Sequence, residues 1–412
     1  MSKRNILFIA AGLLILVLLI LQIPAINSRV AWRYEVAKTY VRNVINPVGS
    51  VPTAIPNSTS TVSPASPTAP VTPTSALMTD TPIPPTPTLA PPPPQASLGS
   101  PPYEKQTANN CGPAALSMML KMFGWTGDQK TISDVIKPVN GDRNVNPDEL
   151  VYWVHNYAGW LRLEYRVGGD LETLKRLIAA RYPVIIEGTT SLNPDDTGWP
   201  DDDLWAAHYL LLTAYDDTTQ TFIAQDAYRG PDKSIPYEQL ESEWKPFNYL
   251  YLVVFLPERE VEVQALLGSN WNPDVNRQNA LASAEAAAVK DPNDAFAWFN
   301  VGSNLVYFER WEEANAAYDK AREIGLPQRM FRYQFGPFIA NFQANRIDDL
   351  LVLTDYALQR TEMSEETWLW HGWALYRKGD LNGAIEDWRK ALSIRPDYQD
   401  ALYALNFVGA TP

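Results

Sequence analysis

A long segment rich in proline, serine and threonine divides this chain into parts that must fold separately. Residues 47–102 hold about half of the 34 prolines and a single charged residue, Asp80. Proline lacks a backbone N–H, and small polar side chains bury little apolar surface, so such a segment cannot build a core. We therefore expect a disordered linker here, followed by the folded domains.

A continuous apolar run lies close to the N-terminus. From Ile6 to Ile26 the only strongly polar side chain is Gln22, and ~20 residues suffice for a helix to cross a bilayer core. A cleaved signal peptide is the alternative, but its apolar region is normally ~7–15 residues long and ends in a small-x-small site, which this run meets poorly. We expect residues 1–26 to form a cytoplasmic stub and a transmembrane helix, with a juxtamembrane segment over 27–46.

Two features predict opposite orientations for this span. More basic residues follow it than precede it, which by the positive-inside rule favours a cytoplasmic C-terminus. The linker, in contrast, is typical of a stalk on an exported protein. We favour export, which predicts a single-pass bacterial cell-membrane protein with extracytoplasmic domains. The basic residues are Lys3 and Arg4 before the span and Arg29, Arg33, Lys38 and Arg42 after it.

Charge and cysteine content exclude several classes of protein. The net charge of −13 argues against nucleic-acid binding, because there is no basic stripe to neutralise phosphates. A single cysteine excludes an internal disulfide, and with three scattered histidines it disfavours a structural zinc site. We expect no cofactor. The acidic loop Asp195–Asp203 leaves calcium binding open, although it lacks EF-hand spacing and a solvated loop is the simpler interpretation.

Residues 103–257 mix helical and strand patterns, which predicts an α+β domain. Helices are expected after Cys111, near 148–157 and over 171–181. Strands are expected over 183–188, in a hairpin formed by 208–215 and 221–227, and over 249–256.

Cys111 is placed where a reactive thiolate would be stabilised. Asn109 or Asn110 can cap a helix, and Pro113 suits its first turn. The free N–H groups and dipole of a helix N-terminus lower the pKa of a thiol. A nucleophilic cysteine also needs a base and donors for the oxyanion, and Gln106 could supply a side-chain amide. The alternative is that Cys111 is a buried core residue, as free cysteines often are.

His208 is the best candidate for the base. His155 fits a helix surface, and His371 lies inside a repeat helix. His208 opens an apolar strand, and Asp226 closes the next one. If the hairpin loop is centred on Asp217, each residue of the first strand lies opposite the residue of the second strand for which the two numbers add up to 434. This pairing places His208 directly opposite Asp226 on one face of the hairpin. An aspartate there can orient the imidazole.

These residues and their neighbours match a known family. The matching positions are Gln106, Cys111-Gly112-Pro113-Ala114, His208-Tyr209 and Asp226. They resemble the bacteriocin-processing (double-glycine) cysteine peptidases, above all their stand-alone relatives of papain-like fold, over 103–257. The resemblance implies Cys111 as nucleophile, His208 as general base and acid, Asp226 as its orienting group, and Gln106 in the oxyanion hole. A long loop before His208 and the lack of an attached transporter depart from the leader-cleaving members.

From about Pro273 the sequence is helical, rich in alanine and repetitive. Gly302, Ala314 and Ala321 recur 70 positions later as Gly372, Ala384 and Ala391. A middle unit with Gly336 and Ala357 lacks the small residue, having Leu350 instead. The pattern resembles the tetratricopeptide repeat, most clearly over 368–396. It predicts an all-α helical-repeat domain over 258–412 that binds a protein or peptide.

The sequence thus predicts a membrane-anchored cysteine peptidase with a peptide- or protein-binding repeat module. Two alternatives stay open. The chain could be a non-catalytic peptide-binding or scaffold protein that keeps the peptidase fold. It could also catalyse acyl transfer, in which an amine replaces water in the second half of the reaction.

Overall fold

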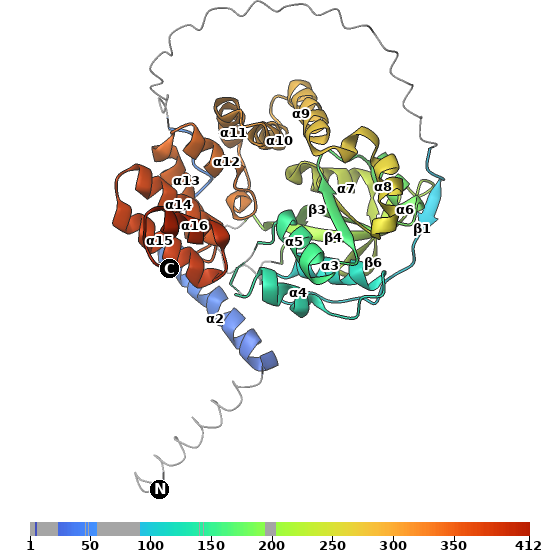
Figure 1. Cartoon of the computed structure of the whole chain (residues 1–412), viewed down its shortest axis with the longest axis horizontal. Coiled ribbons are helices and arrows are strands. Elements are labelled where there is room, and N and C mark those ends of the chain that lie inside the picture. Colours follow the sequence, from blue (N-terminus) through green and yellow to red (C-terminus); the bar gives the residue numbers. More distant parts are fainter. Residues whose placement is uncertain are drawn as a thin grey trace, which may run out of the picture.

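The computed structural model of the chain consists of a sheet-containing domain, a helical array beside it and an N-terminal helix that projects from the array (Figure 1). The structure describes residues 5, 24–45, 47, 49–55, 91–139, 141–142, 144–193 and 203–412. The N-terminal helix, α2, spans Pro24–Ile45 and carries the predicted juxtamembrane segment.

The predicted transmembrane helix lies mostly outside the described residues. Residues 6–23 of the apolar run are among those that the structure does not describe. Within the part of the chain that is described, none of the helices is both long and apolar enough to cross a membrane.

The sheet has seven strands, all paired in antiparallel fashion, in the order β2-β7-β3-β4-β5-β6, with β1 added beside β4. The predicted α+β class and the strands expected over 183–188, in the hairpin and over 249–256 are confirmed. Sequence analysis missed β1, β2 and β6, because these short or peripheral strands are polar and lack an apolar run. The strands are β1 (Gln95–Ser97), β2 (Arg162–Arg166), β3 (Val184–Ser191), β4 (Trp205–Asp216), β5 (Thr221–Asp226), β6 (Gly230–Pro236) and β7 (Tyr251–Phe255).

Helices cover both faces of the sheet, so its central strands are apolar on both sides. On β4, Tyr209 and Leu211 belong to the core beneath α3, α4 and α5, whereas Leu210 and Leu212 belong to the core beneath α6, α7 and α8. The helix α8 adds Val263 and Leu267 to the second core, so this domain extends past the boundary predicted at residue 257. The helices are α3 (Cys111–Lys121), α4 (Gln129–Ile136), α5 (Pro147–Tyr157), α6 (Leu171–Ala179), α7 (Tyr237–Trp244) and α8 (Glu260–Leu267).

The disordered linker predicted over 47–102 is wrong at both of its described ends. Residues 49–55 lie against the helical array, where Val51 is buried. At the other end, β1 pairs with 214–216 of β4, along the part of that strand that β3 leaves open. Proline favours an extended backbone, so a proline-rich segment can add to an open strand edge without a turn of its own. Residues 56–90 lie outside the described part of the chain.

The helical array confirms the predicted all-α repeats. A Cβ atom on Gly302 would lie 2.6 Å from the Tyr318 ring, and one on Gly372 would lie 2.6 Å from the Trp388 ring. The same glycine–aromatic approach therefore occurs twice, 70 residues apart, and lets paired helices pack closely. The helices of the array are α9 (Pro273–Lys290), α10 (Ala295–Tyr307), α11 (Trp311–Ile324), α12 (Gly336–Gln343), α13 (Ile347–Arg360), α14 (Glu365–Arg377), α15 (Leu381–Ile394) and α16 (Gln399–Phe407). Short 3-10 helices before and within the array are η2 (Lys245–Phe247), η3 (Pro257–Arg259), η4 (Gly268–Trp271) and η5 (Met330–Arg332).

The first helix of a repeat unit, α10, faces the sheet domain. Asn300 donates to the carbonyl of Lys245 over 2.9 Å, and Asn304 accepts a hydrogen bond from Asn248 over 2.9 Å. Because buried amides are costly to leave unpaired, these bonds hold the array against η2 in one position.

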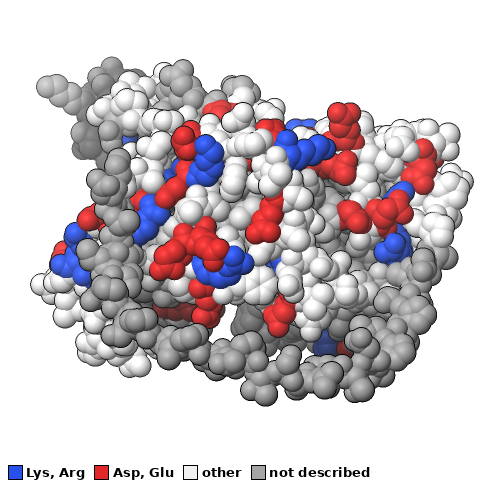
Figure 2. All heavy atoms as spheres, turned by 90° about the horizontal axis from the view of Figure 1, so that it is seen from above, with Lys and Arg blue, Asp and Glu red and all other residues white. Residues whose placement is uncertain are grey.

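Charged side chains are mixed by sign on the face shown in Figure 2, where blue and red groups of the described residues lie next to one another. Ion pairs one helical turn apart contribute to such mixing, for example Arg310 with Glu313 at 2.5 Å and Lys320 with Glu323 at 3.0 Å. The negative charge of the chain is therefore not gathered into one patch on this face.

Candidate active site

The loop before Cys111 is held by one buried glutamine from α4. Gln129 Oε1 accepts hydrogen bonds from the Thr107 N–H over 2.8 Å and from Asn110 Nδ2 over 2.9 Å, and Gln129 Nε2 donates to the carbonyl of Lys105 over 2.8 Å. Asn110 occupies the N-cap position of α3, but its side chain bonds Gln129 and makes no capping bond to the helix. Cys111 is thus the first residue of α3, set there by the loop and not by a side-chain cap.

The hairpin that carries His208 and Asp226 forms as predicted, but in a different register. Near the turn Tyr215 pairs with Phe222, so residue numbers sum to 437, whereas beyond a β-bulge Leu212 pairs with Ala224 and the sum is 436. The predicted sum of 434 is wrong. Beyond the bulge the difference is two residues, however, and a two-residue shift leaves the side chains of that part on their predicted faces.

The extra residue in the bulge, Thr213, decides on which face Asp226 lies. Without it the register near the turn would continue and place Asp226 opposite Leu211, on the face away from His208. With it, extending the observed register by one pair places Asp226 opposite Leu210, on the same face as His208. Gln225 Nε2 bonds Thr213 Oγ1 over 3.2 Å, which ties the bulge to the strand that carries Asp226.

His208 and Asp226 form a buried pair. The Nε2 of His208 lies 2.7 Å from Asp226 Oδ1, and the two residues are 3% and 4% exposed. The same oxygen accepts from the backbone N–H groups of Tyr228 at 2.8 Å and Arg229 at 2.9 Å. Burial raises the pKa of Asp226, but the hydrogen bond and charge of His208 and these two N–H groups lower it to below its usual range. Asp226 is therefore held charged and fixed in orientation.

The remaining ring nitrogen of His208 is available to Cys111, with which the ring forms a hydrogen bond. The pairing of β4 with β5 ends at Leu211, so the edge of β4 is open at Tyr209, and the Tyr209 N–H donates to the thiol. Burial raises the pKa of Cys111, but the hydrogen bond and charge of His208, the Tyr209 N–H and the charge of Lys137 outweigh it and lower that pKa. The thiolate is thereby favoured.

The pKa of His208 changes in the complementary direction. Burial alone would lower it, but the hydrogen bonds and charges of Asp226 and Cys111 raise it to about 9. Both shifts favour a thiolate beside an imidazolium over a neutral pair.

Gln106 reaches the same part of the molecule through its backbone. Its N–H donates over 2.9 Å to the carbonyl of Ala227, the residue that follows Asp226. Its side-chain Oε1 is buried and lacks a hydrogen-bond partner among the described residues. The structure brings Cys111, His208 and Asp226 together. Among the described residues no hydrogen bond joins the Gln106 side chain to Cys111, so the oxyanion role of Gln106 stays a prediction.

Two buried residues beside Cys111, Tyr209 and Glu187, were given no role of their own in the sequence prediction. The Tyr209 hydroxyl donates to the Val145 carbonyl over 2.9 Å, and its ring lies so close to Gly112 that a Cβ there would be 3.3 Å away. Glu187 pairs directly with Tyr209 across β3 and β4. Burial raises the pKa of Glu187 well above its usual value, against a hydrogen bond with Tyr209 that lowers it and with a smaller contribution from the Cys111 charge, so the neutral form is favoured. A glutamate inside the apolar run 183–188 was the available signal.

The other histidines lie elsewhere. His155 is exposed on α5, and His371 bonds Asp387 in the array at 2.6 Å. Among the described residues no group of His, Cys, Asp and Glu has the arrangement of a metal site. The predicted acidic loop lies outside the described residues except for Asp203, whose carboxylate accepts from the Gln328 N–H over 2.6 Å and pairs with Arg329 at 3.5 Å.

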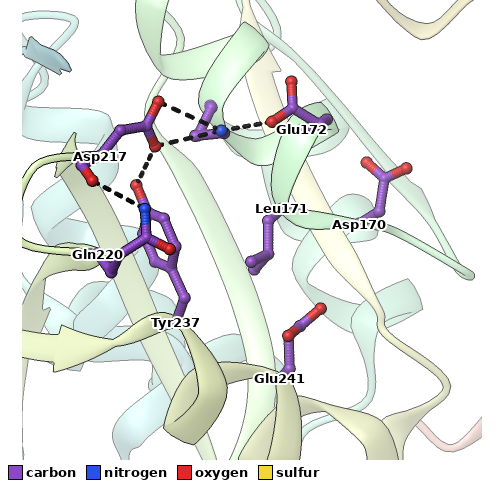
Figure 3. A pocket seen from close by; sticks show the side chains of 8 residues that line it. Asp170, Leu171, Glu172, Asp217, Gln220, Tyr237 and Glu241 are labelled. Atoms are coloured by element: carbon purple, nitrogen blue, oxygen red, sulfur yellow. Dashed lines mark hydrogen bonds and ion pairs between the residues drawn. The ribbon is translucent and has the colours of Figure 1, made fainter. Parts of the chain in front are cut away.

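A hollow of about 550 Å³ lies away from the candidate site (Figure 3). Its acidic residues include Asp170, Glu172 and Asp217, and the last two both pair with Lys175. Asp217 follows the far end of β4 from His208, about 30 Å along the strand at ~3.3 Å per residue. A smaller hollow of about 120 Å³ is lined by His208 and Asp226 themselves, together with Thr190, Arg229, Lys233 and Glu243.

Comparisons with known proteins match both parts of the fold. Residues 97–252 match the model of the Peptidase_C39 like family. The chain carries a Peptidase C39-like domain. This C39-like domain is followed by a TPR-like region, of which residues 372–408 match the model of a TPR repeat. The search of curated proteins gave no match.

Several solved structures resemble parts of the chain. A protein described as a C39-like peptidase from Bacillus anthracis is 17% identical, with 39% of this chain and 97% of that chain covered and a TM-score of 0.31. Xylellain, a cysteine protease from Xylella fastidiosa, is 14% identical, with 40% of this chain and 87% of that chain covered and a TM-score of 0.30. YrrB, a TPR protein described as having an unusual peptide-binding site, is 18% identical, with 35% of this chain and 97% of that chain covered and a TM-score of 0.19.

Proposed function

We propose that the C39-like domain is a papain-like cysteine peptidase that hydrolyses peptide bonds. The observation that carries this proposal is the connected set of Cys111, His208 and Asp226, in which the pKa of the thiol is lowered and that of the imidazole is raised to about 9. A buried core cysteine has no need of such partners, and burial alone would raise its pKa.

The mechanism follows from these positions. The Cys111 thiolate attacks the carbonyl carbon of the scissile bond, and His208 gives its proton to the leaving amine, which leaves a thioester. His208 then takes a proton from water, the resulting hydroxide attacks the thioester, and the acid is released as the thiol forms again. Asp226 keeps the ring oriented in both steps.

The oxyanion needs donors beside the sulfur. The N–H of Cys111 is at the start of α3, where helical N–H groups have no partner within the helix. The Gln106 amide is our proposed second donor. The Tyr209 N–H contributes to lowering the pKa of Cys111, so it stabilises the resting thiolate.

The test is cleavage by the full chain against a peptide library, read by mass spectrometry, beside Cys111→Ser and Ser117→Ala variants. Ser117 lies on the same helix, faces away towards Glu104 and serves as the matched control. We expect cleavage that is lost only in Cys111→Ser. Equal product patterns from all three proteins would favour the non-catalytic scaffold.

We further propose that the TPR-like region binds a protein or peptide and that the N-terminal run anchors the chain in the membrane with its domains outside the cytoplasm. Protease added to intact cells tests the orientation. Digestion of both domains is expected, whereas protection until the membrane is opened would show that the basic residues after the span determine the topology.

A further inference from the structure

Residues 49–55 lie in extended form on two helices of the TPR-like region, α11 and α13. Arg322 Nε donates to the Pro52 carbonyl over 2.7 Å, and the Tyr356 hydroxyl donates to the Gly49 carbonyl over 3.1 Å. The Ile55 N–H donates to Asp349 Oδ1 over 3.4 Å. Each of these bonds goes to the main chain of the segment.

The groups that contact this segment are buried and already held in place by one another. The side chains of Arg322 and Asp349 are 1% and 0% exposed and pair at 3.2 Å. Arg346 pairs with Asp349 and, at 2.7 Å, with Asp319, which also pairs with Arg322 at 3.3 Å. Such a preorganised network loses little freedom when an extended chain binds to it.

One side chain of the segment enters the core of the array. Val51 is 6% exposed and belongs to the apolar core that α11 and α13 share. The proline that follows it restricts both residues to extended backbone. Main-chain hydrogen bonds for affinity, with a pocket for one side chain, are the general way in which proteins recognise extended peptides.

The segment uses different helices from those that meet the C39-like domain. α10 and α14, the first helices of their units, bond that domain through Asn300 and Glu366. Residues 49–55 contact α11 and α13, the second helices of their units. The side chains that bond the segment are therefore not the ones that bond that domain.

We propose that α11 and α13 form a peptide-binding site that the chain fills in cis with residues 49–55, and that an extended peptide with a β-branched apolar residue followed by proline competes for it. The proposal rests on the peptide-binding function assigned above to the TPR-like region and specifies its site and ligand. It is not tied to the chemistry of Cys111.

Docking of this segment has a mechanical consequence. Lys38 and Arg42 of α2 both pair with Glu362, at 3.1 Å and 2.8 Å. The helix that precedes residues 49–55 is therefore also held against the array. β1 holds the other end of the linker on the sheet. The two described ends of the linker are therefore both held on folded parts of the chain, and residues 49–55 must be released before the N-terminal end can move away from the array.

The experiment uses the full chain in detergent and a fluorescent peptide of residues 47–57. In the Val51→Asp variant a carboxylate replaces a buried side chain, so the cis segment should leave. The matched control is Val44→Asp, since Val44 is 58% exposed on α2. We expect saturable binding of the peptide to Val51→Asp and at least ~10-fold weaker binding to the native chain and to the control, because the tethered segment competes at high effective concentration.

Hydrogen exchange completes the test. The Ile55 amide, which donates to Asp349, should exchange more slowly in the native chain than in Val51→Asp. The proposal is overturned if this amide exchanges at the same rate in both chains, or if an undocked Val51→Asp chain does not bind the peptide. The alkylation rate of Cys111, measured on the same samples, reports the C39-like domain separately, so a failure of the peptidase proposal is distinguishable.

Discussion

The described part of the molecule contains two histidine–aspartate pairs, one buried and one partly buried, that look alike and differ in their third partner. His208 lies 2.7 Å from Asp226 in the C39-like domain, and His371 lies 2.6 Å from Asp387 in the TPR-like region. The pKa of each histidine is raised to about 9 against the opposing effect of burial. Neither the short bond nor the raised pKa therefore identifies a catalytic histidine.

The third partner separates the two. The second nitrogen of His371 faces Asp355 at 3.4 Å, so this imidazolium joins three consecutive helices, α13, α14 and α15. For His208 the third partner is the Cys111 thiol at the start of α3. A carboxylate holds a proton and a charge, whereas a thiolate can also form a bond to carbon, and only the second trio can carry out covalent chemistry.

The largest expected effect comes from removing the third partner of each trio. Cys111→Ala should lower peptide cleavage by at least ~10³-fold, because no nucleophile remains. Asp355→Ala, the equivalent change in the other trio, should leave kcat/KM within about twofold. A comparable loss of cleavage in both variants would mean that the repeats, and not the thiol, limit the measured activity.

Replacing the orienting carboxylates should give the next largest difference. Asp226→Asn should lower kcat/KM by ~10²–10⁴-fold, because an amide no longer stabilises the imidazolium in its present orientation. Asp387→Asn should leave kcat/KM unchanged and cost about 1–3 kcal/mol of unfolding free energy. Urea unfolding of both variants checks the second part, and unaltered kcat/KM in Asp226→Asn would remove that residue from the mechanism.

Replacing each histidine should change the alkylation rate of Cys111 by a smaller factor than the changes in kcat/KM above. In the native chain iodoacetamide should alkylate Cys111 well below pH ~8.5, because the pKa of its thiol is lowered mainly by His208. His208→Ala should slow alkylation about 10–100-fold at pH 6.5 and move the profile towards that of a free thiol. His371→Ala should leave the profile in place. If the alkylation rate of the native chain rises only above pH 8.5, Cys111 is a buried core residue and not a nucleophile.

The smallest effect concerns stability and pH. The pKa of His371 is about 9 in the folded chain and ~6.5 when unfolded, so its contribution is complete below pH 6.5 and is lost as the pH rises through about 9. Since Asp355 is largely exposed, we expect only about 1–2 kcal/mol. Urea unfolding at pH 6 and pH 9.5 should show this loss in the native chain and not in His371→Gln. Equal losses in both would assign it to other groups.

Local patterns in the sequence predicted the elements that depend on neighbours along the chain. Pro113 and the apolar run after it indicate the helix that begins at Cys111, and the small residues near 302 and 372 indicate paired repeat helices. The first signal lies within one helix and the second within one pair of helices, so a short stretch of sequence carries each of them.

The placement of Asp226 was decided by tertiary structure. Alternation of apolar residues predicted the hairpin, but the bulge at Thr213 depends on Gln225 and on Leu98, the residue after β1, whose N–H bonds the Thr213 carbonyl. The docking of residues 49–55 likewise depends on Arg322, some 270 positions away along the chain. An extended segment binds wherever main-chain groups are left unpaired by other elements, and which groups remain unpaired is known only once the whole sheet and the whole array have formed.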